Sequence, residues 1–231
     1  MLRAVLFDFN GVLVDDEPLH LELLGRVLAE EGLDASQLDL TRHIGRADRD
    51  ALRDELERAG EEASPDRLSR LIARKAAYYL VRVRVEGFPV ISGAGRVVEE
   101  LAEAGLTLGV VSGALRAEVE GALGQMGVLE RFKCLVTSED VDAGKPNPEG
   151  YLRGLTLLNS LPPLPSRLLH PHEVLAVEDS PAGLEAAAAA GFSSLGVAHT
   201  FSADELGRAD HVIASLDELS MDKLRILFAA S

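Results

Sequence analysis

The 231-residue sequence has one cysteine, no tryptophan and no long apolar run. Because Cys134 has no second cysteine to pair with, no intrachain disulfide can form, and a reducing compartment is the natural expectation. No window reaches the roughly 18 uninterrupted apolar residues that a membrane span requires. The apolar stretch before Asp8 is too short for a signal peptide. We therefore expect a cytoplasmic protein with no membrane partner.

Positive charge is also scarce, since 38 acidic residues stand against 23 lysines and arginines and leave a formal net charge of −15. A body of this charge repels nucleic acid, so we expect no nucleic-acid partner. A small phosphorylated metabolite stays compatible, because a local cationic pocket can override the global field. The length suits one large domain, or a core domain with a smaller second domain. We expect a monomer or a homodimer. Four lysines are present, at Lys75, Lys133, Lys145 and Lys223.

Short apolar runs alternate with helical patterns over most of the chain. The first run, Ala4–Phe7, is continuously apolar, as expected of a strand buried on both faces of a parallel sheet. The other runs are Leu106–Val111, Cys134–Val136, Val174–Val177, Leu195–Val197 and His211–Ala214. The helical patterns between them are Ala94–Ala104, Ala114–Gln125, Pro148–Leu158 and Pro181–Ala190. This alternation predicts the α/β class, with a Rossmann-like open parallel sheet.

One stretch breaks this alternation. Between about Asp16 and Phe88 the pattern shows amphipathic helices near Glu17–Glu31, Asp48–Ala59 and Pro65–Val85, and no convincing strand. So much helix cannot lie under a single crossover connection, so we predict an α-helical cap domain inserted after the first strand. The predicted boundaries are 1–15 and 89–231 for the α/β catalytic core and 16–88 for the cap.

Polar side chains follow four of the apolar runs. Because the carboxyl ends of parallel strands meet at one edge of a sheet, we expect a ligand site there. Taken singly, each residue except Lys145 has a simpler explanation as a turn or cap residue. Taken together, they favour a shared site. The residues are Asp8 and Asn10, Ser112 and Gly113, Lys145 in the Gly144–Pro148 loop, and Glu178 and Asp179.

Four segments in this order resemble the four motifs of the haloacid dehalogenase-like superfamily: Asp8–Asp15, Ser112, Gly144–Glu149 and Glu178–Gly183. The resemblance covers nearly the whole chain and is nearest to the helical-cap phosphatases and the β-phosphoglucomutase-like group. It implies an Mg²⁺-dependent phosphatase that acts on a small phosphorylated metabolite, such as a sugar phosphate, through an aspartyl-phosphate on Asp8. A phosphomutase is the alternative.

The resemblance also implies roles for the core residues. Asp8 is the nucleophile and a metal ligand, and Asn10 offers its backbone carbonyl to Mg²⁺. Glu178 and Asp179 complete the oxygen ligands that Mg²⁺ prefers. Lys145 offsets negative charge during catalysis and also binds phosphate. Phosphate oxygens are also held by Ser112 and Gly113.

In the predicted cap, His20 stands twelve residues after Asp8, as in the β-phosphoglucomutase-like group, and Lys75 lies near the position of that group's cap lysine. Asp48 stands where that group has a substrate-binding arginine, with Arg46 and Arg49 on either side. These four cationic or titratable residues, His20, Arg46, Arg49 and Lys75, are our candidates for substrate recognition.

Asn10 departs from the family pattern, which has a second aspartate at this position. That aspartate protonates the leaving group and then activates water, and an amide can do neither. Because general acid–base catalysis contributes about 10²–10⁴-fold, we expect slow turnover. Three explanations are open. Asn10 is an introduced change that traps the phosphorylated state, or a natural residue with Asp16 as substitute base, or the mark of a non-catalytic protein that binds Mg²⁺ and a phosphorylated ligand.

Overall fold

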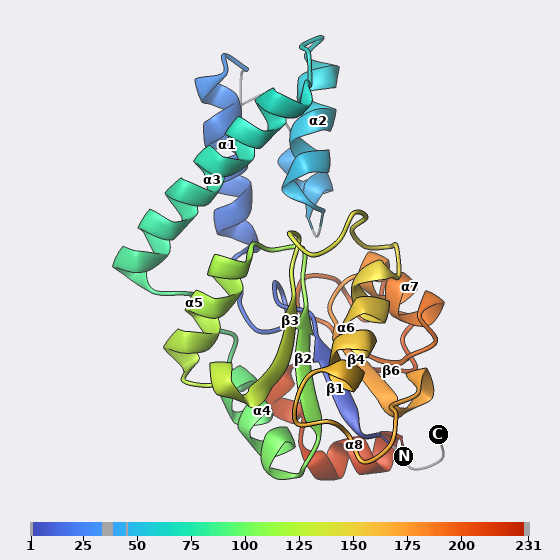
Figure 1. Cartoon of the computed structure of the whole chain (residues 1–231). Coiled ribbons are helices and arrows are strands. Elements are labelled where there is room, and N and C mark those ends of the chain that lie inside the picture. Colours follow the sequence, from blue (N-terminus) through green and yellow to red (C-terminus); the bar gives the residue numbers. More distant parts are fainter. Residues whose placement is uncertain (1, 34–38, 45, 229–231) are drawn as a thin grey trace. The chain divides into compact units, whose positions relative to one another are not determined.

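The structure, a computed structural model, describes residues 2–33, 39–44 and 46–228. The chain divides into two compact units, of which one contains Met1–Asp15 and Pro89–Ser231 and the other Asp16–Phe88. Figure 1 shows the first unit as a sheet flanked by helices and the second as a group of helices. Within the described ranges, no helix is both long enough and apolar enough to cross a lipid bilayer.

Six parallel strands form the sheet of the first unit, in the order β3-β2-β1-β4-β5-β6. They are β1 Ala4–Phe7, β2 Thr107–Val111, β3 Phe132–Val136, β4 Val174–Glu178, β5 Ser193–Val197 and β6 His211–Ile213. Each overlaps a predicted apolar run, so the α/β class with a parallel, Rossmann-like sheet is confirmed. The strand order reverses between β1 and β4, and such a switch point is where open α/β sheets bind ligands.

Helices cover both faces of this sheet, with α4 and α5 on one side and α6 and α7 on the other (Figure 1). Their bounds are α4 Ala94–Glu103, α5 Arg116–Met126, α6 Glu149–Ser160, α7 Pro181–Ala189 and, near the end of the chain, α8 Met221–Leu227. All four residues of β1 are buried because the strand has a neighbour on each edge and helices on each face. Tyr151 and Leu158 of α6 and Ala186 of α7 are buried in the hydrophobic core on this side of the sheet.

The start of α7 determines how the residues before it are held. Ser180 is the N-cap, and its side chain accepts a hydrogen bond of 3.1 Å from the backbone N–H of Gly183. Pro181 occupies the first helical position, where a missing N–H costs nothing. Glu178, the last residue of β4, and Asp179, which follows it, therefore lie directly before a firmly capped helix.

The second unit is helical. It contains α1 Glu17–Glu30, the short 3₁₀ segment Leu40–His43, α2 Asp48–Arg58 and α3 Pro65–Glu86. Apolar side chains at helical spacing on the three α-helices form its buried core, including Leu24, Leu28, Leu52, Leu56 and Leu68. The helical insertion that the sequence pattern predicts after the first strand is therefore present.

Candidate active site

Asp8 is the first residue beyond β1 and is nearly buried. Its backbone N–H donates to the carbonyl of Val177 in β4 at 2.9 Å. In the sheet register, Phe7 pairs with Val110 on one side and with Val177 on the other. The carboxylate of Asp8 therefore emerges at the switch point, between the carboxyl ends of β2 and β4.

Lys145 joins two of the predicted acids. Its Nζ lies 2.7 Å from Oδ1 of Asp8 and 2.6 Å from Oε1 of Glu178. Burial alone would lower the pKa of this ammonium, but the charges of Asp8 and Glu178 outweigh burial and raise the pKa of Lys145. The lysine is therefore held in its charged form beside the predicted nucleophile.

Asp8, Glu178 and Asp179 form a buried group whose ligand oxygens all lie within 4.8 Å of one another. Burial, and then the charge of Asp8, raise the pKa of Glu178 against the lowering effect of Lys145. With all three acids ionised, three carboxylates and one ammonium leave two negative charges in a small volume. A divalent cation with a preference for oxygen ligands fits both the charge and the donor type of this group.

Tyr151 supports the site, although sequence reasoning assigned it no role. Its hydroxyl donates to Oε1 of Glu178 at 2.5 Å, and the hydroxyl of Ser180 donates to Oε2 at 3.3 Å. Burial, followed by the charge of Glu178, raises the pKa of Tyr151, so the phenol keeps its proton. The available signal was weak: Tyr151 is one of three tyrosines and lies two residues after the Gly144–Glu149 motif.

Two glycines of the motifs allow the acids to approach the backbone. Gly11 has φ +74°, and a Cβ at this position would lie 1.8 Å from Oδ2 of Asp179. A Cβ at Gly183, in the first turn of α7, would lie 2.0 Å from Oε2 of Glu178. Larger residues at either position would displace one of the acids.

The predicted phosphate-binding residues lie at the end of β2. Ser112 is buried, its N–H donates to the carbonyl of Val136 at 2.9 Å, and its Oγ accepts from the N–H of Ala114 at 2.9 Å. Gly113 is exposed, with no heavy atom within 4 Å of the place a Cβ would take. Asn10 lies in the turn after β1, next to β2 in the sheet, and forms an isolated backbone β-bridge with Val14.

The second unit brings His20 and Lys75 together. Nζ of the buried Lys75 lies 2.6 Å from Nδ1 of His20 and 2.7 Å from Oδ1 of Asp48. Nε2 of His20 lies 3.3 Å from Oδ2 of the buried Asp16, which also accepts a hydrogen bond from the hydroxyl of Tyr79. Burial and Lys75 act to lower the pKa of His20, but Asp16 reverses the balance and raises it.

The two cap arginines take separate positions. Arg46 is exposed and pairs with Asp54 at 2.7 Å. Its guanidinium also lies 3.3 Å from Nδ1 of His43. Arg49 is exposed in the first turn of α2. Neither belongs to the buried network of Asp16, His20 and Lys75.

The fold and this group of side chains define an α/β protein with a carboxylate, a lysine and an acid pair at the switch point of a parallel sheet. Residues 2–191 match the family model described as haloacid dehalogenase-like hydrolase, and the chain belongs to that family. The family resemblance of the four motifs is thereby confirmed.

Two curated relatives are phosphatases. Validoxylamine A 7'-phosphate phosphatase of Streptomyces hygroscopicus subsp. limoneus is 31% identical over 220 residues, which cover 95% of this chain and 96% of that protein. Hexitol phosphatase A of Escherichia coli is 28% identical over 222 residues, covering 96% and 94%. Among solved structures, β-phosphoglucomutase from Clostridium difficile has a TM-score of 0.84 at 20% identity, covering 99% of this chain and 98% of that one. This last similarity shows the fold alone.

Proposed function

We propose that this chain is a magnesium-dependent phosphatase that acts on a small phosphorylated metabolite, of the sugar-phosphate type, through an aspartyl-phosphate on Asp8. The observation that carries the proposal is the contact of the Lys145 ammonium with both Asp8 and Glu178, at 2.7 and 2.6 Å. An isolated aspartate would repel a phosphate dianion, whereas this aspartate has a fixed cation beside it. The phosphatase names of the two curated relatives support the reaction class.

The proposed reaction has two displacements. In the first, a carboxylate oxygen of Asp8 bonds to phosphorus while the ester O–P bond breaks, and the leaving oxygen takes up a proton. In the second, water attacks the same phosphorus, which releases phosphate and restores Asp8. A divalent cation bound by Asp8, Glu178, Asp179 and the backbone carbonyl of Asn10 would supply Lewis acidity at the phosphoryl oxygens. Ser112, Gly113 and Lys145 would hold those oxygens while charge develops.

The helical unit is proposed as the cap, residues 16–88, and the remainder, residues 1–15 and 89–231, as the catalytic core. Substrate recognition is assigned to His20, Lys75, Arg46 and Arg49. Asp16 is the proposed substitute base, since the related family pattern usually has a serine at this position and its carboxylate contacts the imidazole of His20.

Variants of Asn10 and Asp8 give the most direct test of this proposal. Phosphate release is measured on a panel of sugar phosphates, with and without Mg²⁺, for the parent, Asn10→Asp and Asp8→Asn. We expect the parent to release phosphate slowly and only with Mg²⁺. Release should rise by up to about 10²–10⁴-fold in Asn10→Asp, and Asp8→Asn should release no phosphate. Release by Asp8→Asn at the parent rate would overturn the proposal. Asp16→Asn in the parent background should abolish the residual turnover if Asp16 is the base.

Two other functions predict different outcomes for the phosphoryl group. A phosphomutase is favoured by the contact between His20 and Lys75, and it would move phosphate to a second hydroxyl of the sugar without releasing it into solution. Against it, Asp48 occupies the position of the expected arginine and pairs with Lys75. A non-catalytic binding protein is suggested by Asn10. It would bind Mg²⁺ and a sugar phosphate with no phosphoryl label ever appearing on Asp8.

A further inference from the structure

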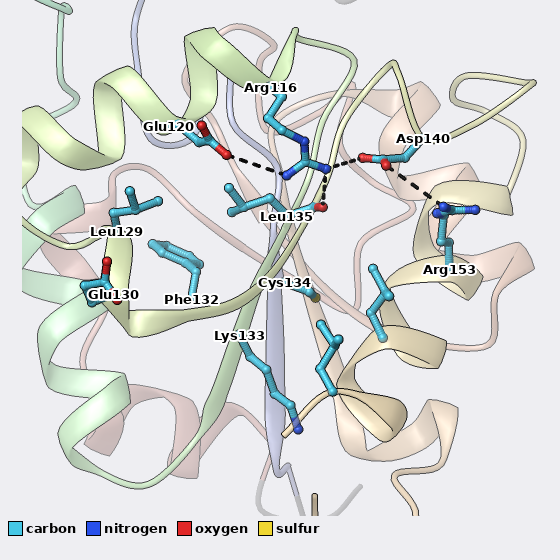
Figure 2. Close-up of a pocket in the computed structure, with 12 residues that line it drawn as sticks. Arg116, Glu120, Leu129, Glu130, Phe132, Lys133, Cys134, Leu135, Asp140 and Arg153 are labelled. Carbon is cyan, nitrogen blue, oxygen red and sulfur yellow. Dashed lines mark hydrogen bonds and ion pairs between the residues drawn. The ribbon is translucent and has the colours of Figure 1, made fainter. Parts of the chain in front are cut away.

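The outer edge strand β3 borders a cavity of about 490 Å³, with α5 and α6 on its sides (Figure 2). At one rim, Arg116, the first residue of α5, points toward Asp140 of the loop that follows β3 (Figure 2). One guanidinium nitrogen donates to Oδ2 of Asp140 at 2.7 Å and to the carbonyl of Leu135 at 3.2 Å. The helix that follows Ser112 is thus tied to the strand and loop that lead to Lys145.

Further hydrogen bonds join the same two segments. The N–H of Arg116 donates to Oε2 of Glu139 at 2.7 Å. The N–H and hydroxyl of Ser138 both donate to the carbonyl of Ala114, at 3.1 and 3.2 Å. Several hydrogen bonds therefore connect residues 112–116, which include the proposed phosphate-binding groups, to residues 137–140.

Asp140 closes the turn with which the Lys145 loop begins. Its Oδ2 accepts from both the N–H and the hydroxyl of the buried Thr137, at 2.9 Å each. At the other end of the loop, the carboxylate of Glu149 accepts from the N–H groups of Asp142 and Ala143, each at 3.0 Å. The four residues between Asp140 and Lys145 are thus held at both sides, and Arg116 contacts this loop through Asp140.

We propose that Arg116 is a positioning residue, whose ion pair with Asp140 keeps the phosphate-binding segment 112–114 and the Lys145 loop at the separation that phosphoryl transfer to Asp8 requires. This inference rests on the proposed function. The Arg116 side chain is 39% exposed and that of Asp140 is 21% exposed, so the pair contributes little to global stability. Its effect falls on geometry, because small misplacements of groups around a reacting phosphoryl are costly in rate.

The test is a double-mutant cycle with Arg116→Met and Asp140→Asn, and it is read from the single-turnover rate of Asp8 phosphorylation by acetyl phosphate and Mg²⁺. We expect each single variant to lose about 10- to 100-fold in rate, and the double variant to lose no more than either, with melting temperatures close to the parent's. Arg131→Met is the matched control, since Arg131 is similarly exposed and pairs with Glu99 at 2.7 Å away from this rim. It should label Asp8 at the parent rate.

Chemical rescue and hydrogen exchange separate positioning from general damage. Added guanidinium should restore part of the rate of Arg116→Ala, because the guanidinium site opens into the cavity, while methylammonium should not. Asp140→Asn should also speed amide exchange in residues 112–116, a readout that needs no catalysis. Parental phosphorylation rates, additive losses or unchanged exchange would overturn the inference. A parent chain that never labels Asp8, with exchange still accelerated in Asp140→Asn, would instead count against the proposed function.

Discussion

Tyr151 and Lys145 both contact the same oxygen of Glu178, at 2.5 and 2.6 Å. The hydrogen bond from Tyr151 and the ion pair with Lys145 together orient that buried oxygen, and the carboxylate in turn stabilises the lysine beside Asp8. The tyrosine comes from α6, the acid from the end of β4 and the lysine from the loop between β3 and α6. The position of the Lys145 ammonium therefore depends on three separate segments.

Tyr151→Phe should lower the rate of Asp8 phosphorylation and weaken the Mg²⁺ dependence of that rate. A hydrogen bond to a charged group is worth about 1.5–3 kcal/mol, which corresponds to about a tenfold to hundredfold change. The ring contact with Phe192, at 5.6 Å between centroids, remains, so the fold should persist. Titrating the rate with Mg²⁺ checks this. Tyr78→Phe, which removes an exposed bond to Glu30 in the helical unit, is the control and should leave the titration unchanged.

Gly11→Ala should abolish productive metal binding. The new Cβ would meet Oδ2 of Asp179 at 1.8 Å and Oγ1 of Thr200 at 2.5 Å, so the acid must move. Gly105→Ala provides the comparison, since Gly105 also has a positive φ, +85°, but a Cβ there meets nothing within 4 Å. Each substitution should cost about 1–2 kcal/mol of stability through its left-handed backbone. Calorimetric Mg²⁺ binding should fail for Gly11→Ala alone, and equal binding by both variants would contradict the clash.

Asp48→Asn should destabilise the chain more than Asp50→Asn, two residues further along α2. Lys75 is buried and pairs with Asp48 at 2.7 Å, so losing the acid leaves a poorly compensated buried ammonium. Because Asp48 is 35% exposed, we expect about 1–3 kcal/mol, less than for a fully buried pair. Asp50 pairs with Arg53 at the surface and should cost less than about 1 kcal/mol. Urea unfolding measures both, and equal losses would show that the Lys75 pair is not special.

Glu173→Gln should reduce the loss of stability in acid. The side-chain bond from Arg167 is the largest cause that lowers the pKa of Glu173, from 4.5 to about 2. A carboxyl with a lowered folded-state pKa stabilises the fold above its unfolded pKa, and this stabilisation is lost as the pH falls toward the folded value. The parent should therefore lose more stability than Glu173→Gln between about pH 5 and about pH 2. The free energy of unfolding, measured in urea across this pH range, tests the pair. Arg167→Gln should behave like Glu173→Gln. The same pH dependence in the parent and both variants would refute the prediction.

Much of the fold could be predicted because burial on both faces of a parallel sheet leaves a continuous apolar run. β1 matches its predicted span, Ala4–Phe7, residue for residue. β3 begins at Phe132, two residues before the predicted start at Cys134, because Lys133 interrupts the apolar run of this edge strand. Helix α5 begins at Arg116, two residues after the predicted start at Ala114, because the N–H groups of Ala114 and Leu115 bond to the side chains of Ser112 and Glu118.

The residues around the motifs were harder to foresee. Tyr151 appears in the sequence as an ordinary aromatic residue on the apolar face of α6, and Arg116 as one of many charges at a helix start. Each gains its role from a partner more than twenty residues away, Glu178 and Asp140. Local periodicity reports burial and secondary structure, and it contains no information about which distant atom a side chain meets.

The sequence by itself determined the α/β class, the helical insertion, the family and the set of acids and lysine at the strand ends, because each of these depends on local pattern or on short ordered motifs. Only the tertiary structure decided that Lys145 contacts Asp8 and Glu178, that Gly11 makes room for Asp179, and that His20 contacts Lys75. Those contacts depend on the order and register of the parallel strands and on how each helix packs, and these are properties of the whole packed chain that no single segment contains.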